Sequence, residues 1–351
     1  MASDSRAAVK GTVSSHLTRL VLRTAHEAGV RAPETARLPG LASETLAGDF
    51  VRPPTESLLR LWEVFTATAA TPGAGLRVAE NAELGRLHVW DYLFAGAGSL
   101  AAGARQAAEW LHLLVDPSAV MTVEEDGDLL TIGYSSESSW THAADGIHEF
   151  IMALILRRGR EAVGRGLAPV HVGFAHGAPR SHHHLTSAFG TGHLDFARPA
   201  NSVTFLAAET RTGRPADPAL TRILSQYADF LATASRPAPT WRERFEQHLA
   251  LAIADGAPTL ERLAHRLAVT PRTLQRRLAD HGTTWQRELD GARNAYAIAL
   301  KEEGSPMAAI AARLGYSDPR SLRRAMRRWS ATDQVGASHP AHSPDRHQDL
   351  V

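Results

Sequence analysis

The first two thirds of the chain contain apolar residues in two different periods. Three segments place them at the intervals of three and four residues that an amphipathic or buried helix requires. These segments are LLRLWEVF at 58–65, AAEWLHLLVD at 107–116 and HEFIMALILRR at 148–158. The pattern therefore predicts three helices in this part of the chain.

Between the second and third of these segments, apolar residues alternate with polar residues on both sides of Asp126 and Gly127. The alternating apolar residues are Met121, Val123, Leu130, Ile132 and Tyr134. Period-two alternation around an Asp-Gly pair predicts a β-hairpin. VHVGF at 170–174 and NSVTFLA at 201–207 predict further strands, so this part of the chain is expected to mix α and β structure.

The pattern changes near residue 236. A helix is predicted over 218–234, and the two prolines of RPAPT at 236–240 cannot continue it. From Trp241 onward every periodic segment is helical, up to a polar end that we expect to be disordered. The predicted fold class is α+β, with a mixed α/β domain at 1–235, a linker at 236–240, an all-α domain at 241–332 and a tail at 333–351.

Residues 259–282, TLERLAHRLAVTPRTLQRRLADHG, predict a helix-turn-helix. The apolar face of its first helix consists of Leu260, Leu263, Ala264 and Leu267. AVT forms the turn, Thr270 can cap the second helix, and Pro271 suits the first helical position. Burial of Leu274 and Leu278 directs the remaining polar side chains outward, namely Arg272, Thr273, Gln275 and Arg276.

The same pattern returns over residues 305–330. Its first helix is lined by Ile310, Ala311 and Leu314. Gly315 ends that helix, and Asp318 before Pro319 starts the next one. The second helix has one apolar face, formed by Leu322, Ala325, Met326 and Trp329. Three arginines then point away from the core, namely Arg320, Arg324 and Arg327.

The second helix begins at Thr270 in the first motif and at Ser317 in the second motif, and these starts are 47 residues apart. TWQRELDGARNAYAIALKEEG lies between them and predicts a helix of about 18 residues, which is about 27 Å long. Successive major-groove segments on one face of DNA lie about 34 Å apart. One chain can therefore place the second helix of each motif in neighbouring major-groove segments.

The net charge of +1 conceals an uneven distribution of charge. Residues 259–330 carry 14 basic and 7 acidic side chains, whereas the other 279 residues carry 24 basic and 30 acidic ones. Nucleic-acid binding depends on the local field rather than on the total charge. A single arginine-rich helix is more often a solvated surface, and some such helices bind membranes. The repeated motif favours DNA binding over a solvated surface and over membrane binding.

The composition suits a protein of two globular domains, with 351 residues, 44% hydrophobic and 21% charged. Apolar runs such as IMALIL at 151–156 are far shorter than the about 20 residues of a membrane-spanning helix. The N-terminus has no signal-peptide pattern. The absence of cysteine excludes disulfides, thiol nucleophiles and zinc-thiolate sites. We expect a cytoplasmic protein that has no membrane partner.

Histidines suggest one alternative chemistry. SHHHL at 181–185 lies near His171, His176 and His193. Adjacent residues on a helix point about 100° apart, so three neighbouring histidines rarely converge on one ion. No nucleophile-elbow or glycine-rich phosphate motif occurs in the sequence. We therefore predict no metal site, no cofactor and no catalytic residues, and we expect that the protein is not an enzyme.

Both motifs, together with the segments upstream of them, resemble one known protein family. VTPRTLQRRL and GYSDPRSLRRAMRRW, with this linker between them, resemble the DNA-binding domain of the AraC family of transcriptional regulators over residues 241–330. Upstream, ESLLRLWE, GAGLRVAE, VEEDGDLLTI and AFGTGHLDFARPANSVTF are similar to the ligand-binding domain of a subgroup of that family. The resemblance therefore extends over most of the chain.

The resemblance implies which side chains contact DNA. Its base-reading positions fall at Arg272, Gln275, Arg276, Arg320, Ser321, Arg323 and Arg324. Arginine can form two hydrogen bonds with guanine, and glutamine can do so with adenine. Phosphate contacts are expected from Arg277, Arg327 and Arg328. Two features depart from the family: Pro319 replaces a frequently polar residue, and ATDQVGASHP replaces the ending Ser-Pro-x-x-Tyr-Arg.

The resemblance also implies partners. These are double-stranded promoter DNA, a small-molecule effector of unknown identity, RNA polymerase and a second copy of the chain, with activation more usual than repression. The sequence assigns no effector-binding residues; His88, Trp90 and Tyr92 either line a pocket or belong to ordinary core and surface. A DNA-repair alkyl acceptor would need a cysteine. The other alternative, a metal-dependent cupin-like enzyme or sensor fused to a DNA-binding module, would need converging histidines.

Overall fold

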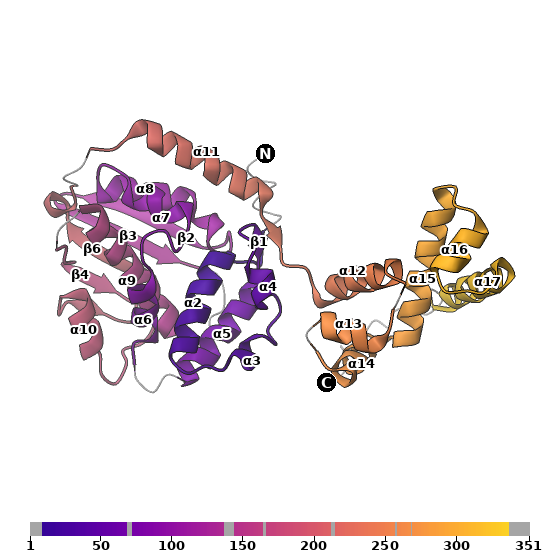
Figure 1. Ribbon diagram of the computed structural model, residues 1–351. Helices are drawn as coiled ribbons and strands as arrows, with labels where there is room; N and C mark the ends of the chain where they lie inside the picture. Colours follow the sequence, from indigo (N-terminus) through magenta and orange to yellow (C-terminus); the bar gives the residue numbers. More distant parts are fainter. Residues whose placement is uncertain are drawn as a thin grey trace, which may run out of the picture. The chain divides into compact units, whose positions relative to one another are not determined.

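A computed structural model describes residues 9–68, 72–136, 144–163, 166–211, 215–256, 258–267 and 269–336. The chain divides into two compact units, Met1–Ala238 and Pro239–Val351, and each has its own hydrophobic core. Figure 1 shows strands and helices in the first unit, whereas the described part of the second contains helices only. The predicted α+β fold class is therefore confirmed.

A five-stranded sheet forms the centre of the first unit, in the order β2-β3-β6-β4-β5. The strands are β2 (Val120–Asp126), β3 (Leu129–Ser135), β4 (His171–Gly173), β5 (Leu194–Asp195) and β6 (Asn201–Leu206). The predicted hairpin is confirmed, because Asp126 pairs with Leu129 and Gly127 takes the positive φ of +56° that glycine tolerates. β4 and β6 confirm the other two strand predictions. All pairs are antiparallel except β4 with β5.

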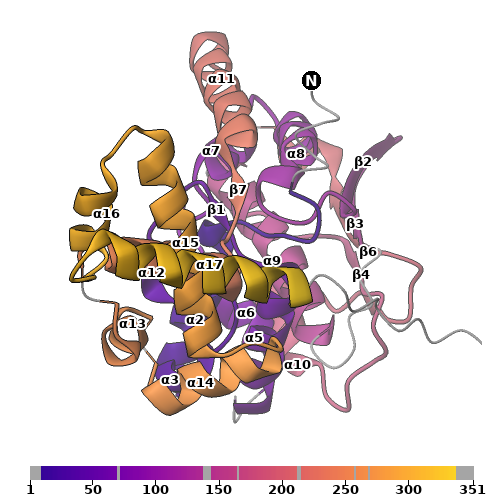
Figure 2. The ribbon, with the colours of Figure 1, turned by 90° about the vertical axis from the view of Figure 1, so that its right-hand side faces the viewer.

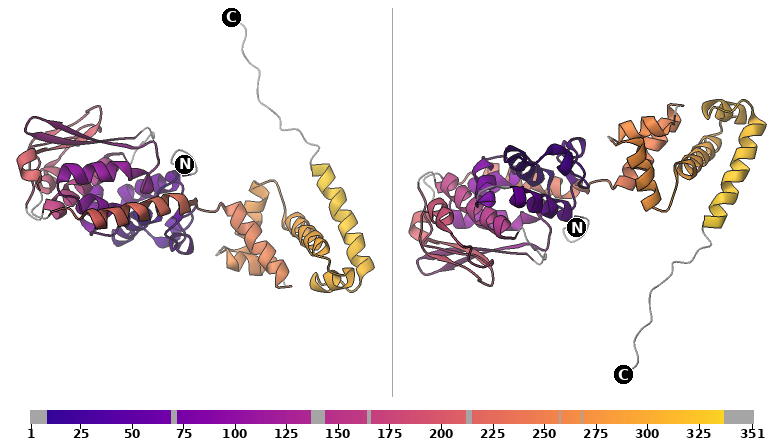
Figure 3. Two further views of the ribbon diagram at one scale, coloured as in Figure 1. Left: turned by 90° about the horizontal axis from the view of Figure 1, so that it is seen from above. Right: turned by 90° about the horizontal axis from the view of Figure 1, so that it is seen from below.

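Helices pack against this sheet, with α8 (Leu100–Glu109) against β2 and α9 (Ala144–Val163) against β6 (Figure 3). The remaining helices before α11 are α2 (Ser15–Glu27), α3 (Ala32–Thr35), α4 (Ser43–Leu46), α5 (Thr55–Thr68), α6 (Ala74–Asn81), α7 (Val89–Ala95) and α10 (His183–Phe189). α5 and α9 confirm two of the three predicted helices. None of the described helices is long and apolar enough to cross a membrane.

The third predicted helix, over 107–116, is wrong in its extent. α8 ends at Glu109, and Trp110 leaves helical geometry with φ −100° and ψ 13°. A short 3-10 turn, η1 (Leu111–Leu113), follows. Trp110, Leu111 and Leu113 are all buried. The apolar run therefore belongs to a core segment that changes direction, which periodicity alone does not distinguish from a continuous helix.

The first unit ends with α11 (Pro218–Ala234), which confirms the helix predicted there and lies beside α7 (Figures 1 and 2). The predicted linker at 236–240 is wrong at its start, because β7 (Arg236–Pro237) pairs with β1 (Val51–Arg52). The amides of Arg236 and Ala238 donate to the carbonyls of Phe50 and Arg52. Pro237 fits between them because its missing N–H would point away from β1.

The second unit contains α12 (Trp241–Ala254), α13 (Leu260–Arg266), α14 (Pro271–Asp280), α15 (Trp285–Glu302), α16 (Met307–Arg313) and α17 (Pro319–Gly336). α15 lies between α12–α14 and α16–α17 in Figures 1 and 3. Leu263, Leu274 and Leu278 from the first motif share a core with Leu322 and Trp329 from the second. Most residues of the predicted apolar faces are therefore buried, whereas Leu260, Leu267 and Met326 are half-buried against the same core.

The last helix is longer than predicted. α17 continues to Gly336, past the ends predicted at 330 for the second motif and at 332 for the domain. The sequence ATDQVG contains no proline, so nothing in the backbone chemistry stops the helix there. The first four residues of the predicted tail are thus helical, and its remainder, 337–351, lies outside the described residues.

Candidate functional site

The first candidate DNA-binding helix is α14. Thr270 caps it, since its hydroxyl accepts a hydrogen bond from the Thr273 amide at 3.2 Å, and Pro271 occupies the first turn. Leu274 and Leu278 are fully buried. The side chains predicted to read bases from this helix are all exposed, namely Arg272, Gln275 and Arg276. Of the predicted turn before it, residue 268 lies outside the described residues.

The second candidate DNA-binding helix is α17, and Asp318 fixes its start. One carboxylate oxygen accepts from the amides of Arg320 and Ser321, at 2.7 and 2.9 Å. The Ser321 hydroxyl donates to the other oxygen at 2.7 Å. These hydrogen bonds, the Ser321 hydroxyl first among them, lower the pKa of Asp318. Because Pro319 occupies the first helical position, where no N–H is needed, this departure from the family pattern suits a helix start.

A glycine ends one helix in each motif, and both glycines adopt the same backbone geometry. Gly315 follows α16 with φ +76°, and the Tyr316 amide donates to the Ala311 carbonyl. Gly282 follows α14 with φ +68°, and there the Thr283 amide donates to the Leu278 carbonyl. This C-terminal capping geometry needs a left-handed residue, which glycine adopts at little cost. In the second motif it produces the sharp turn between α16 and α17.

The outward face of α17 is occupied by arginines. Burial of Leu322, Ala325 and Trp329 leaves Arg320, Arg323, Arg324, Arg327 and Arg328 exposed. Ser321 is half-buried, and its hydroxyl lies 3.5 Å from the Arg324 guanidinium. Arg320 and Arg324 project opposite the buried face, which agrees with the prediction from periodicity. The helix thus presents at least two guanidinium groups on the side opposite its buried face.

Four exposed arginines of α14 and α17 differ from several surface arginines of the first unit in their lack of acidic partners. Surface arginines of the first unit form ion pairs with neighbouring carboxylates, as in Arg31–Glu34, Arg60–Glu63 and Arg86–Glu83. By contrast, the side chains of Arg272, Arg276, Arg320 and Arg323 have no ion-pair partner among the described residues. Their positive charge is therefore available to an external polyanion.

Arg277 lies elsewhere than the other arginines of α14. It is half-buried, and its guanidinium carbon is 5.9 Å from the centre of the Trp241 indole. Trp241 also stacks on His281, with ring centres 5.1 Å apart. Burial, together with repulsion from Arg244 and Arg276, lowers the pKa of Arg277. A phosphate contact by Arg277 stays a prediction, and the observed contact joins α14 to the start of α12.

A bidentate ion pair fixes α15 to α12. The two terminal nitrogens of Arg242 each donate to a carboxylate oxygen of Glu288 at 2.7 Å. Burial opposes ionisation of Glu288, but the hydrogen bonds from Arg242 prevail and lower the pKa of this carboxyl. α15 has 18 residues, as predicted, and also packs against α16 and α17. It therefore joins α12, which packs against α13 of the first motif, to both helices of the second motif.

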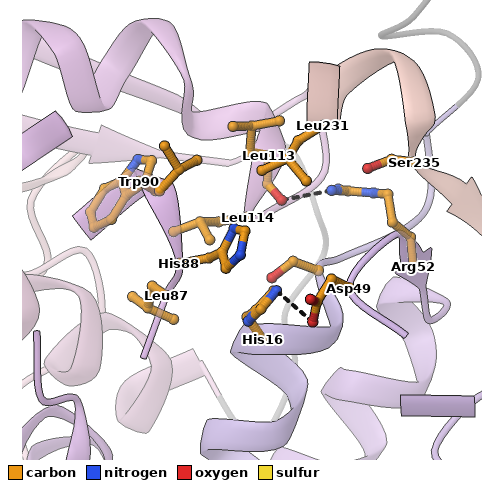
Figure 4. A pocket seen from close by; sticks show the side chains of 12 residues that line it. His16, Asp49, Arg52, Leu87, His88, Trp90, Leu113, Leu114, Leu231 and Ser235 are labelled. Atoms are coloured by element: carbon orange, nitrogen blue, oxygen red, sulfur yellow. Dashed lines mark hydrogen bonds and ion pairs between the residues drawn. The ribbon is translucent and has the colours of Figure 1, made fainter. Parts of the chain in front are cut away.

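The first unit contains a small cavity beneath α11, with a volume of about 20 Å³ (Figure 4). His88 and Trp90 line it, so two of the three residues considered for a pocket lie there, whereas Tyr92 is 46% exposed on the surface. His88 has the unusual φ of +63°, and its ring stacks on His16 and lies against Tyr227 of α11. Because His88 directly precedes α7 and contacts both α2 and α11, this residue in a strained backbone conformation joins the three helices.

Among the described residues, one group has ligand atoms close enough together for a metal ion: His16, Asp49 and His88. The Arg19 guanidinium lies 2.9 Å from His16 Nδ1 and 3.2 Å from an Asp49 oxygen. Since guanidinium only donates, His16 Nδ1 accepts, and the proton on Nε2 faces Asp49 at 3.4 Å, as Figure 4 shows. A neighbouring cation and a protonated Nε2 both disfavour metal, so we interpret the group as a hydrogen-bonded network.

The histidines at 181–185 have separate neighbours. His184 lies 3.4 Å from Glu149, and His182 lies against the Phe196 ring. His171 lies 3.0 Å from Asp195 on the sheet edge, and the buried His176 stacks on His148. These contacts direct the rings toward different partners.

Two family models match the chain. One, described as the arabinose-binding domain of AraC transcription regulators, matches residues 29–212, and the other, a helix-turn-helix domain, matches residues 263–332. The second match contains both α14 and the start of α17. The two matches cover both compact units.

Similar proteins carry related descriptions. The ornithine utilization regulator of Pseudomonas aeruginosa is 26% identical over 75% of this chain and 78% of its own length. The transcriptional regulator VqsM of the same species is 43% identical over 25% of this chain and 27% of its own. The crystal structure of the regulator CdpR, also from Pseudomonas aeruginosa, covers 91% of this chain and 97% of its own at 21% identity, with a TM-score of 0.45.

The relatives named above are all transcriptional regulators, and no enzymatic family is indicated. The first family model alone spans more than half of the chain. The second covers the helices that carry the exposed arginines of both motifs. The chain therefore belongs to the AraC family of DNA-binding transcriptional regulators.

Proposed function

We propose that this regulator binds two neighbouring major-groove segments, one with α14 and the other with α17. Two observations carry this proposal. The two capped helices expose Arg272, Arg276, Arg320 and Arg323, which have no ion-pair partner among the described residues, and the packed helix α15 lies between the two helices in sequence. In this proposal bases are contacted by Arg272, Gln275 and Arg276 from α14 and by Arg320, Arg323 and Arg324 from α17. Arg327 and Arg328 bind phosphates.

The structure supports a smaller role for Ser321 than the family resemblance implies. Its hydroxyl already donates to Asp318 and is half-buried. We therefore assign Ser321 chiefly to the helix start, from which its oxygen can still accept a hydrogen bond from Arg324.

Selection of bound duplexes from a random pool tests the proposal. We expect each recovered site to contain two conserved blocks about one helical turn, roughly 10 base pairs, apart. Recovery of one continuous block, or of no common sequence, would argue against reading by two helices.

We further propose that the first unit binds a small effector and that the protein activates transcription in the cytoplasm by engaging RNA polymerase. One relative is an ornithine utilization regulator, which favours control of a metabolic function. An effector can act as a switch only if it binds the active arrangement more tightly than the inactive one. Reporter expression from a selected site, with and without the regulator, tests the direction of regulation.

We propose that the homodimer forms through α11. One face of this helix packs on the first unit through Ala228 and Leu231. A flank of the helix exposes a stripe of four large apolar side chains, Leu220, Ile223, Tyr227 and Phe230. Two of them are only partly free, because Tyr227 also lies against His88 and Phe230 against Phe50. Ile223 is 62% and Phe230 is 55% exposed. A stripe at intervals of three and four residues can pair with its own copy across a two-fold axis.

Ile223→Asp is expected to convert the dimer to monomers, because it places a charge at the centre of the apolar stripe in both copies. We expect the dimer dissociation constant to rise at least about tenfold. Light scattering coupled to size-exclusion chromatography measures this. Gln226→Asp introduces the same charge beside the stripe and should change the dissociation constant little. If the dimer dissociation constant changed equally in the two variants, α11 would not be part of the interface.

A further inference from the structure

A second cavity in the first unit lies among α2, α5, α9 and β3. Its volume is about 50 Å³, and apolar side chains form most of its wall. They include Leu17 from α2, Leu58 and Trp62 from α5, and Ile147 and Phe150 from α9. All five side chains are buried in the core of this unit. The cavity is therefore a pocket inside the packed domain rather than a groove on its surface.

Two hydroxyl groups in the wall lack hydrogen-bond partners. The Tyr134 side chain on β3 is buried, with 4% of the residue exposed, and its oxygen has no partner among the described residues. The same is true of the Thr55 hydroxyl at the start of α5, which is also buried. Both residues line the cavity. Buried hydroxyls are normally paired, because leaving one unpaired costs free energy.

Two other polar residues line this cavity, Ser136 and Asp116, and the carboxylate of Asp116 is already occupied. Asp116 accepts hydrogen bonds from the amides of Gly11 and Ser118. Burial, with a smaller contribution from the Asp116 charge, raises the pKa of Tyr134, so the phenol stays neutral and can both donate and accept. The negative charge of Asp116 disfavours a second anion nearby. Apart from Asp116, the wall is thus apolar with neutral hydroxyls, of which those of Tyr134 and Thr55 lack partners among the described residues.

We propose that this cavity binds a small uncharged molecule that has an apolar body and one hydroxyl or carbonyl group, which hydrogen-bonds to Tyr134 and Thr55. The volume suits a body of about four to seven non-hydrogen atoms. A carboxylate head is excluded by Asp116. The assignment deepens the proposed effector-binding role and rests on it for its regulatory meaning, but the binding itself can be measured without DNA.

A water molecule would satisfy the hydroxyls but not the rest of the cavity. Water requires two to four polar partners, and most of the wall here is apolar. An organic molecule fills both parts at once, because its head pairs the hydroxyls while its body contacts the side chains of α2, α5 and α9. It would also tie these three helices to the sheet.

The proposal is tested on the full-length protein by calorimetric titration with 1-butanol, 1-hexanol and cyclohexanol, and with hexanoate as the charged counterpart. We expect saturable binding of at least one alcohol and at least about tenfold weaker binding of hexanoate. Tyr134→Phe keeps the ring but removes the hydroxyl, and it should weaken alcohol binding about fivefold. The matched control is Tyr92→Phe at the exposed tyrosine, which should leave the affinity unchanged.

A second variant controls for a merely structural effect of Tyr134. Ile147→Trp adds volume to the wall and should abolish binding of all three alcohols. Thermal unfolding of each variant shows whether the unit remains folded. Failure of every alcohol to bind saturably, or an unchanged affinity in Tyr134→Phe, would overturn the proposal. Loss of DNA binding would instead concern α14 and α17, so the two failures can be distinguished.

Discussion

Replacing Arg324 with alanine is expected to weaken binding to the specific site by about 1–3 kcal/mol, or roughly 5- to 150-fold. Arg324 projects from α17 opposite the buried face of Leu322 and Ala325. An arginine in this position can form two hydrogen bonds with a guanine. Random duplexes do not present that guanine in register, so their binding should fall much less. Titration of labelled specific and random duplexes at one fixed salt concentration measures both quantities.

Arg327→Ala provides the matched comparison one turn further along the same helix. We expect it to weaken specific and random binding alike, because a phosphate contact carries no sequence information. It should also reduce the dependence of affinity on salt. If both variants lost the same fraction of affinity for the two kinds of duplex, the division between base and phosphate contacts would have to be abandoned.

Replacing Asp91 with alanine is expected to destabilise the first unit by about 3–5 kcal/mol. Arg158 and Asp91 form an ion pair of 2.6 Å, and both side chains are completely buried. The second oxygen of Asp91 accepts from the amides of Gly85 and Leu87, each at 2.8 Å. Without the carboxylate, these amides and part of the guanidinium remain buried without their partner. A fall of about 10 °C in the unfolding temperature is expected from calorimetry.

Glu83→Ala is the control for this experiment. Glu83 pairs with Arg86 at 3.0 Å, but both side chains are largely exposed. Exposed ion pairs contribute at most about 1 kcal/mol. A loss of stability in Asp91→Ala no larger than that in Glu83→Ala would show that the buried network has little energetic importance. DNA binding at a temperature where both variants are folded should be unaffected.

The second unit could be predicted closely from the sequence because its signals are local. Thr270 and Pro271 mark one helix start, Asp318 and Pro319 mark another, and Gly315 marks a turn. The apolar intervals identified the side chains that are buried, and the arginines on the opposite face followed from geometry. What periodicity could not give is the position of Arg277, since its neighbour Trp241 is 36 residues away in sequence.

The first unit was less predictable because its decisive contacts join distant segments. Nothing near Asp91 in the sequence indicates a partner at Arg158, and no pattern brings Tyr134 and Thr55 to one cavity. His16, Asp49 and His88 were likewise missed as a group. The break at Trp110 and the pairing of Arg236 depend on the packing around them. Only the Asp-Gly hairpin, which is specified by local turn chemistry, was predictable in detail.

In the proposed mode of binding, α15 holds α14 and α17 at a fixed separation along the duplex. The most direct test is to insert five base pairs between the two blocks of a selected site and to measure the affinity of the full-length protein. Half a helical turn moves the second block to the opposite face of the duplex. We predict that the affinity falls at least about 100-fold, toward that of a random duplex. An unchanged affinity would contradict reading of two adjacent segments by one chain.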